Sequence, residues 1–346
     1  MSELTMMKCC QNCFNDSYLY DYIRYQAIEL DTCGYCKSKD VLTVEPNSLC
    51  VLFEPLVDAY ILDENGKTLV DCFRDDWFLF SSSKMNSQAM QVLLGEILDD
   101  ANVVRKLYSL PISPSDTTLK VWEEFKEELK HSNRFFIKKQ INEQILSQMF
   151  PYITLLKNDR PEEWFRARLQ YSQSDVYGIH EMGAPPKDKV GHGRANPAGI
   201  PYLYIASQVD TAVSEVRPHT GDAVSVATII MSESVKLLDL RDPKLRASPF
   251  EMLGTSSDIG SLKKGIEFLD KLGEELTRPV RREAAAYDYV PSQFLCELIK
   301  HYGYDGVVYK SSVGEGFNAA LFDPSLAEVT SVKSFVVKRV TVDLDA

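Results

Sequence analysis

The chain has 346 residues, 45% of them hydrophobic and 25% charged, which is typical of a globular protein and argues against a largely disordered one. Its length exceeds the size at which a single hydrophobic core usually stops growing, so we expect more than one domain. The formal net charge of −12 argues against a protein that coats nucleic acid through clustered lysine and arginine side chains.

The amino-terminal segment MSELTMMKCC has no charged stretch followed by a long apolar core. No later stretch reaches the roughly 20 apolar residues that a membrane helix needs. We therefore expect a cytoplasmic protein that has no membrane partner. Eight cysteines in a chain without a secretion signal are expected to be thiols or metal ligands and not a disulfide framework.

Four cysteines near the start form two close pairs, Cys10-x-x-Cys13 and Cys33-x-x-Cys36. Each pair can occupy one tight turn, so two such turns can bring four thiolates around a tetrahedral Zn²⁺. The spacing predicts a structural zinc site that stabilises a segment too small to hold a core of its own. Cys9 is an alternative ligand to Cys10, and free thiols or a redox pair remain the competing interpretations.

Residues 48–150 alternate aromatic and aliphatic residues with acidic ones in runs that are long enough for helices. The clearest run breaks near Ser132-Asn133, so it predicts a pair of helices. The two apolar stripes of this pair are Leu119, Trp122, Phe125 and Leu129, and then Ile137, Ile141 and Ile145. Such stripes are typical of faces that pack into a core.

Beyond about residue 156 the pattern changes to short runs rich in Val, Ile and Tyr, bounded by Gly, Pro, Asp or Ser. Helical segments interrupt these predicted strands at 210–217, 261–285 and 291–303. The order predicts an α+β domain that has no regular βαβ repeat. We predict three parts, which are a zinc-binding knuckle at 1–47, a mostly helical domain at 48–155 and the α+β domain at 156–346.

The densest group of unusual residues lies between Gly191 and Pro218. It begins with a Gly-rich loop in which Arg194 supplies a planar cation able to hold a phosphate with two hydrogen bonds. A predicted strand follows, and then a short helix that Asp210 or Thr211 can cap. This helix would place Thr211 and Glu215 on the same face, because they are four residues apart.

These residues resemble the RES domain, a family named for its Arg, Glu and Ser and known as the toxins of bacterial toxin–antitoxin pairs. The resemblance covers residues 164 to about 324 and implies an ADP-ribosyltransferase-like fold. It also implies an enzyme that degrades NAD or transfers ADP-ribose from it. The segments that carry it are Phe165-Arg166, Gly193-Arg194, Leu203-Tyr204-Ile205-Ala206, Thr211-Ala212-x-x-Glu215, and Asp305-Gly306 followed by Ser311 and Asn318.

The resemblance implies Arg166, Glu215 and Ser311 as the catalytic residues. The bond between nicotinamide and ribose breaks through an oxocarbenium-like state, and the leaving group is already cationic, so an anion beside the ribose is required but a general acid is not. Glu215 would supply this anion, while Arg166 holds the pyrophosphate. Ser311 would orient the ribose or a phosphate.

The residues implied to bind NAD, which is the substrate here, are Arg168, Arg194, Tyr204 and Asn318. Arg168 is an alternative to Arg166, because two residues that are two apart share one face of a strand, and Ser312 is an alternative to Ser311. Tyr204 either stacks near the nicotinamide or packs in the core.

The zinc knuckle with its helices more weakly resembles an amino-terminal module of some RES proteins that is related to the HEPN helical proteins. HEPN ribonucleases carry an Arg followed closely by a His on one helix, and the helical region has no such pair, so ribonuclease activity is not expected. We expect this half to regulate, dock or sense. The family implies an antitoxin or inhibitory protein partner, and a homo-oligomer stays open.

Three functions follow from these residues. The first is a NAD-consuming toxin or antiphage defence effector that hydrolyses or phosphorolyses the nicotinamide–ribose bond. The second is an ADP-ribosyltransferase that modifies a protein or nucleic acid, using the same pocket with a different acceptor. The third is a sensor that binds a nucleotide without cleaving it, and Glu215 together with Arg166 argues against this one.

Overall fold

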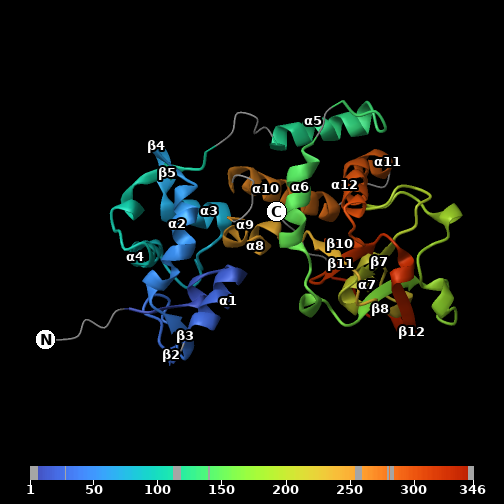
Figure 1. The fold of residues 1–346 in the computed structure, drawn as a ribbon. Coiled ribbons are helices and arrows are strands. Elements are labelled where there is room, and N and C mark those ends of the chain that lie inside the picture. The colour runs from blue at the N-terminus through green and yellow to red at the C-terminus, as the bar shows by residue number, and fades with distance from the viewer. Residues whose placement is uncertain are drawn as a thin grey trace. The chain divides into compact units, whose positions relative to one another are not determined.

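The structure is a computed structural model that describes residues 7–27, 29–111, 118–138, 141–253, 259–278, 280 and 284–341 (Figure 1). The chain divides into two compact units. Unit 1 comprises Met1–Thr118 and Pro243–Glu267, and unit 2 comprises Leu119–Asp242 and Phe268–Ala346. None of the described helices is long and apolar enough to cross a membrane.

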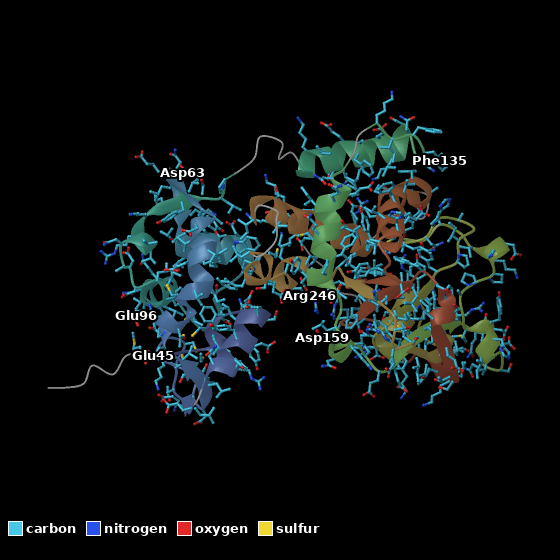
Figure 2. The ribbon with its side chains drawn as sticks, in the orientation of Figure 1. Glu45, Asp63, Glu96, Phe135, Asp159 and Arg246 are labelled. Carbon is cyan, nitrogen blue, oxygen red and sulfur yellow. The ribbon has the colours of Figure 1, made fainter. Side chains whose placement is uncertain are left out.

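Unit 1 begins with a small antiparallel sheet in the order β1 (Cys9–Cys10), β3 (Val41–Val44), β2 (Glu29–Asp31). Helix α1 (Ser17–Gln26) follows the first strand, and it starts where the Asp16 side chain accepts a hydrogen bond from the Leu19 amide at 2.9 Å. Beside this sheet, Tyr35 donates to Glu96 of a later helix at 2.5 Å, and Figure 2 labels Glu96.

The rest of unit 1 is mainly helical, with one long-range strand pair. Its elements are α2 (Cys50–Asp58), β4 (Ile61–Thr68), α3 (Leu69–Trp77), α4 (Ser87–Ile97), β5 (Leu107–Ser109), α8 (Pro243–Arg246) and α9 (Pro249–Met252). Phe53 lies at the centre of the core, 6.2 Å from Phe73 and 5.1 Å from Phe250 between ring centroids. Because Phe250 packs here, the segment that carries α8 and α9 belongs to this unit.

The helical pair expected after residue 118 is partly confirmed. Helix α5 (Thr118–His131) ends at the predicted break and buries Trp122, Phe125 and Leu129, whereas the side chain of Leu119 lies outside the described residues. The second stripe is wrong. Ile137 and Ile141 precede the next helix, α6 (Glu143–Met149), which buries Leu146 and Met149.

The physical reason for this difference is local hydrogen bonding. The Glu128 carboxylate accepts from the Asn133 side chain and from the Lys138 amide, both at 3.0 Å, so it holds the chain in a turn where the stripe predicts helix. Asn142 then caps α6, its side chain accepting from the Ile145 amide at 3.1 Å. The cap satisfies one of the unpaired amides of the first turn, so it favours a helix that begins at Glu143.

Unit 2 is built on one seven-stranded sheet in the order β12-β8-β6-β7-β11-β10-β9. Only the β9–β10 pair is parallel among the described strands. The predicted α+β class without a βαβ repeat is therefore confirmed. The strands are β6 (Trp164–Leu169), β7 (Leu203–Ala206), β8 (Ala223–Met231), β9 (Leu237–Asp239), β10 (Gly306–Lys310), β11 (Phe317–Leu321) and β12 (Ala327–Val336).

Two hydrophobic clusters lie on the sheet. One contains Trp164 and the other Ala167, and because alternate residues of a strand point to opposite faces, the two clusters cover opposite sides. The helices are α7 (Val209–Glu215), α10 (Ile259–Thr277), whose first nine residues belong to unit 1, α11 (Ala285–Asp288) and α12 (Val290–His301).

Helix α7 packs on β6 and contributes Ala212 to the Ala167 cluster. The predicted cap at Asp210 or Thr211 is wrong, because the helix already begins at Val209 and its first turn has no side-chain cap. Thr211 instead accepts a hydrogen bond from the Gly316 amide at 3.1 Å. This contact joins α7 to the segment that enters β11.

Candidate functional site

A cavity of about 320 Å³ lies in unit 2 and has a size suited to a small-molecule ligand. Its lining includes five of the seven residues predicted for the site, and three aromatic side chains, Phe165, Tyr289 and Tyr309, complete much of the wall. The five predicted residues are Arg166, Arg194, Tyr204, Glu215 and Asn318.

Glu215 ends α7 and is held by two donors. Its Oε1 accepts from Ser311 Oγ at 2.8 Å and from Asn318 Nδ2 at 2.5 Å. Asn318 is buried on β11, and Ser311 directly follows β10, so two adjacent strands fix one carboxylate oxygen. Among the described residues Oε2 has no partner. The carboxylate therefore keeps one oxygen for a ligand at the rim of the cavity.

The structure brings Ser311 to this carboxylate and leaves Ser312 exposed. Ser311 Oγ also accepts from the Val313 amide at 3.2 Å. With that amide as its donor and Glu215 as its acceptor, the hydroxyl has a defined direction. Of the two alternatives left open by the sequence, only Ser311 shares a hydrogen bond with Glu215.

Arg166 projects from β6 into the cavity. Its guanidinium donates to the Tyr204 carbonyl at 2.9 Å, and its buried Nε has no partner in the described part of the chain. Burial lowers the pKa of Arg166 to about 10, and the nearby charge of Arg168 adds to this effect. The group still carries its charge at neutral pH, so the wall holds a buried, incompletely satisfied cation that favours an anionic ligand.

Arg168 lies outside the cavity lining. Its guanidinium donates to the Glu181 carbonyl at 2.6 Å and lies over the Tyr177 ring, 4.0 Å from the centroid. These contacts link β6 to the segment that follows it, which contains Tyr177 and Glu181. The two arginines share a strand face, as expected, but the structure gives them different neighbours.

The side chains of Tyr204 and Arg194 both form hydrogen bonds with other parts of the protein. The Tyr204 hydroxyl donates to Asn196 Oδ1 at 2.7 Å and accepts from the Ala195 amide at 3.0 Å. Arg194 donates to the carbonyls of Leu276 and Arg278, at the end of α10. Burial raises the pKa of Tyr204 well above its usual value, so the phenol stays protonated and able to donate.

Gly193 meets these groups so closely that a side chain would not fit. A Cβ at this position would lie 2.2 Å from Asn196 Oδ1 and 2.5 Å from the Tyr204 hydroxyl. We expect Gly193→Ala to break that hydrogen bond and to lower the free energy of unfolding by about 1–3 kcal/mol.

Thermal unfolding of Gly193→Ala measures this loss. The matched control is Gly183→Ala, where an added Cβ meets nothing within 4 Å. Equal melting temperatures for the two variants would contradict the proposed clash.

Several residues at this site carry no signal in the sequence. Ser292 and Gln293, in the first turn of α12, donate to the backbone carbonyls of the Gly-rich loop. Tyr309 is buried on β10 and lines the cavity, where burial and the nearby Tyr204 and Glu215 raise its pKa. A polar residue at a helix start and a tyrosine in a strand are both ordinary, so sequence spacing could not single them out.

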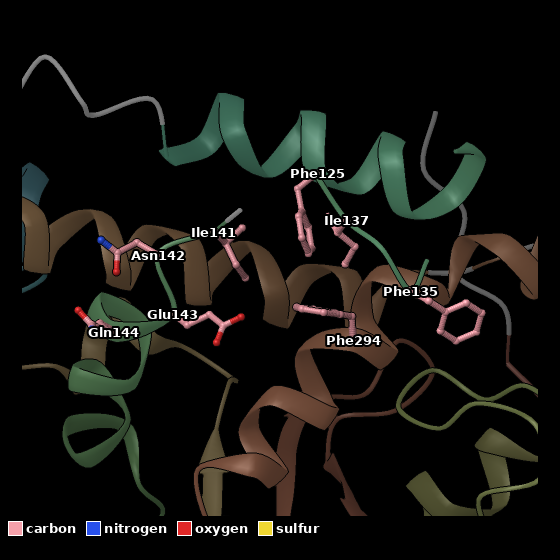
Figure 3. A pocket seen from close by; sticks show the side chains of 8 residues that line it. All are labelled: Phe125, Phe135, Ile137, Ile141, Asn142, Glu143, Gln144 and Phe294. Atoms are coloured by element: carbon pink, nitrogen blue, oxygen red, sulfur yellow. The ribbon is translucent and has the colours of Figure 1, made fainter. Parts of the chain in front are cut away.

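A second, larger hollow of about 730 Å³ lies in unit 2 beside α5. Figure 3 shows Phe125 and Ile137 pointing toward Phe294 of α12, while Glu143 supplies the carboxylate in this lining. Phe135, at its rim, is 91% exposed (Figure 2). Five of its eight described lining residues are apolar and none of the eight is a cation, so among them there is no counterpart to the charged pair of the smaller cavity.

The four paired cysteines come together in unit 1. Their sulfur atoms lie within 4.8 Å of one another, with Cys10 and Cys36 3.5 Å apart and Cys13 and Cys33 3.4 Å apart. Tetrahedral coordination at a Zn–S distance of about 2.3 Å places sulfurs about 3.8 Å apart, so the spacing fits. Cys9 is also buried but is outside this group.

Comparison with known protein families decides what the α+β unit is. The family model of the RES domain matches residues 163–345. The chain belongs to the RES domain family. The match confirms the resemblance drawn from the sequence, and it contains every residue of the predicted RES site.

The RES chain also has a similar solved structure, and no similar protein was found among curated proteins. It is the crystal structure of the MbcT–MbcA toxin–antitoxin complex of M. tuberculosis. The sequence identity is 14% and the TM-score is 0.32, over 56% of this chain and 93% of that chain.

Proposed function

We propose that this RES protein consumes NAD by cleaving the bond between nicotinamide and ribose. One observation carries the proposal, which is the Glu215 carboxylate fixed through one oxygen by Ser311 and Asn318. Its other oxygen has no partner in the described part of the chain and can accept a further hydrogen bond, at the rim of a cavity that also contains Arg166. An anion at one wall and a buried cation in the same cavity suit a substrate with a cationic reacting centre and a diphosphate.

The chemistry needs few groups from the protein. The C1′–N bond breaks, its electron pair moves to the pyridinium nitrogen, and neutral nicotinamide leaves without a general acid. The ribose then carries positive charge, which Glu215 stabilises by accepting from a ribose hydroxyl. An oxygen of water or phosphate forms the new bond at C1′, and in hydrolysis the proton of the water passes to solvent.

The arginines of the cavity support the binding of the diphosphate group of NAD. The unpartnered Nε of Arg166 and its lowered pKa both mark a guanidinium that gains from an anion. Arg194 also lines the cavity, although its guanidinium donates to carbonyls at the end of α10. We assign Arg166 to the diphosphate and Arg194 to the shape of the loop. Arg168 supports the strand from outside the cavity.

We propose that the protein acts in the cytoplasm as a toxin or defence effector, which stops growth by depleting the cell of NAD. An antitoxin or another inhibitory protein would restrain it. Unit 1 would dock or sense, with the sulfur atoms of its four clustered cysteines holding a structural zinc ion.

The test is to incubate the purified full chain with NAD and to measure nicotinamide release with phosphate, without it, and with a lysate that supplies acceptors. Free ADP-ribose indicates hydrolysis, and ADP-ribose joined to phosphate indicates phosphorolysis. Macromolecules that carry ADP-ribose indicate transfer. NAD binding without any release would instead support a sensor. A chain that neither binds NAD nor releases nicotinamide contradicts the proposal.

A further inference from the structure

The loop formed by residues 191–196 (the 191–196 loop) is held by hydrogen bonds from two side chains of α12. Gln293 Nε2 donates to the carbonyls of Gly193 and Asn196, both at 2.9 Å. Ser292 Oγ donates to the Arg194 carbonyl at 2.6 Å. Both side chains are buried, with exposed fractions of 6% and 2%, so water does not compete for these bonds.

The loop also closes on itself. Asn196 Nδ2 donates to the Gly191 carbonyl at 3.1 Å, and the Gly193 amide donates to the Asn196 carbonyl at 2.9 Å. Together with the bonds from α12, the carbonyls of Gly191, Gly193, Arg194 and Asn196 all have donors within the protein.

Among the amides of the loop, those of Gly193 and Ala195 also have acceptors, which are the Asn196 carbonyl and the Tyr204 hydroxyl. Those of His192 and Arg194 have no acceptor among the described residues, and both residues line the cavity that holds Arg166. Backbone amides in a turn that have no acceptor in the protein can bind an anion. The loop therefore keeps two amides for a ligand, and the two side chains of α12 help to hold its conformation.

We propose that Gln293 and Ser292 are positioning residues that hold the 191–196 loop in the conformation in which its amides bind the diphosphate of NAD. This inference rests on the proposed function. Neither side chain belongs to the cavity lining, so their effect on the substrate passes through the loop. Preorganisation of this kind strengthens binding because the loop does not have to be ordered when the ligand arrives.

The experiment compares wild-type chain with Gln293→Leu, which keeps the approximate volume but removes both hydrogen bonds. We expect the KM for NAD to rise about tenfold while kcat stays within about twofold, because the lost interaction is made equally before and during reaction. Ser292→Ala, the milder second variant, is expected to raise KM about threefold. Hydrogen exchange of the loop amides should become faster in both variants.

The matched control is Gln170→Leu. Gln170 also uses Nε2 to bind two oxygens, those of Ser225 and Ser334, but it lies outside the cavity lining. The KM of Gln170→Leu for NAD should equal that of the wild-type chain. An equal rise of KM in this control, or folded Gln293→Leu and Ser292→Ala proteins with unchanged KM, overturns the inference.

Hydrogen exchange separates this inference from the proposed function. If wild-type chain neither binds NAD nor releases nicotinamide, the proposed function fails, and the inference fails with it even where exchange of the loop becomes faster. If the wild type is active and exchange of the loop in Gln293→Leu is unchanged, only the role of α12 is wrong. Faster exchange with unchanged KM also refutes that role.

Discussion

Glu215→Gln is expected to lower kcat for nicotinamide release by about a thousandfold while KM for NAD stays near the wild-type value. Glutamine keeps a carbonyl oxygen where Glu215 Oε1 accepts from Ser311 and Asn318, so the local geometry is retained. What disappears is the negative charge beside the ribose. Because that charge matters most when the ribose becomes cationic, its loss acts on the transition state and not on binding.

The measurement is the initial rate of nicotinamide release over a range of NAD concentrations. The matched control is Glu328→Gln, which neutralises an exposed carboxylate on β12 that lies outside the cavity lining. Its kcat should equal that of the wild type. Full turnover in Glu215→Gln and also in Glu215→Ala would refute the role of this carboxylate.

Several strands of unit 2 were predicted, because short runs rich in Val, Ile and Tyr suit a buried sheet. The run AVSVATIIM, for example, coincides with β8, Ala223–Met231. The order of the strands could not be predicted, since it depends on contacts between distant segments. The parallel pairing of β9 with β10, for example, joins Leu237 to Gly306. Sequence spacing carries no information about such a pairing.

The same limit applies to the way in which segments group into units. Residues 243–267 follow β9 in the chain, yet they group with unit 1, where Phe250 packs against Phe53. An apolar residue predicts burial but not the core in which it is buried. The division into a knuckle at 1–47, a helical domain at 48–155 and an α+β domain at 156–346 stays a prediction.

Residue identity was enough to predict some members of the site but not others. Glu215, Ser311 and Asn318 meet in the structure, because α7 and two neighbouring strands converge there. Their roles stay predictions. Gln293, in contrast, recognises backbone carbonyls, which every residue has, so no pattern of residue types marks it. Arg168 shares a strand face with Arg166 but contacts Tyr177, which only the structure could reveal.

Purified chain is expected to carry about one zinc ion, and Cys10→Ser is expected to remove it and to unfold the part of unit 1 that surrounds the site. The four sulfurs lie within 4.8 Å of one another on β1, on the short 3₁₀ helix Gln11–Cys13 and on the turn between β2 and β3. These short elements bury few large side chains of their own. Without the metal, four adjacent buried thiols contribute little that would hold the segments together.

Cys9→Ser is the control that decides between the two ligands left open by the sequence. Cys9 is as buried as Cys10 but is not part of the sulfur cluster, so its variant should keep the zinc. Metal analysis gives the zinc content, and thermal unfolding with and without a chelator gives its contribution to stability. Zinc retained in Cys10→Ser but lost in Cys9→Ser would reverse the assignment. A wild-type chain whose stability a chelator leaves unchanged would show that the cysteines are thiols that pack in the core.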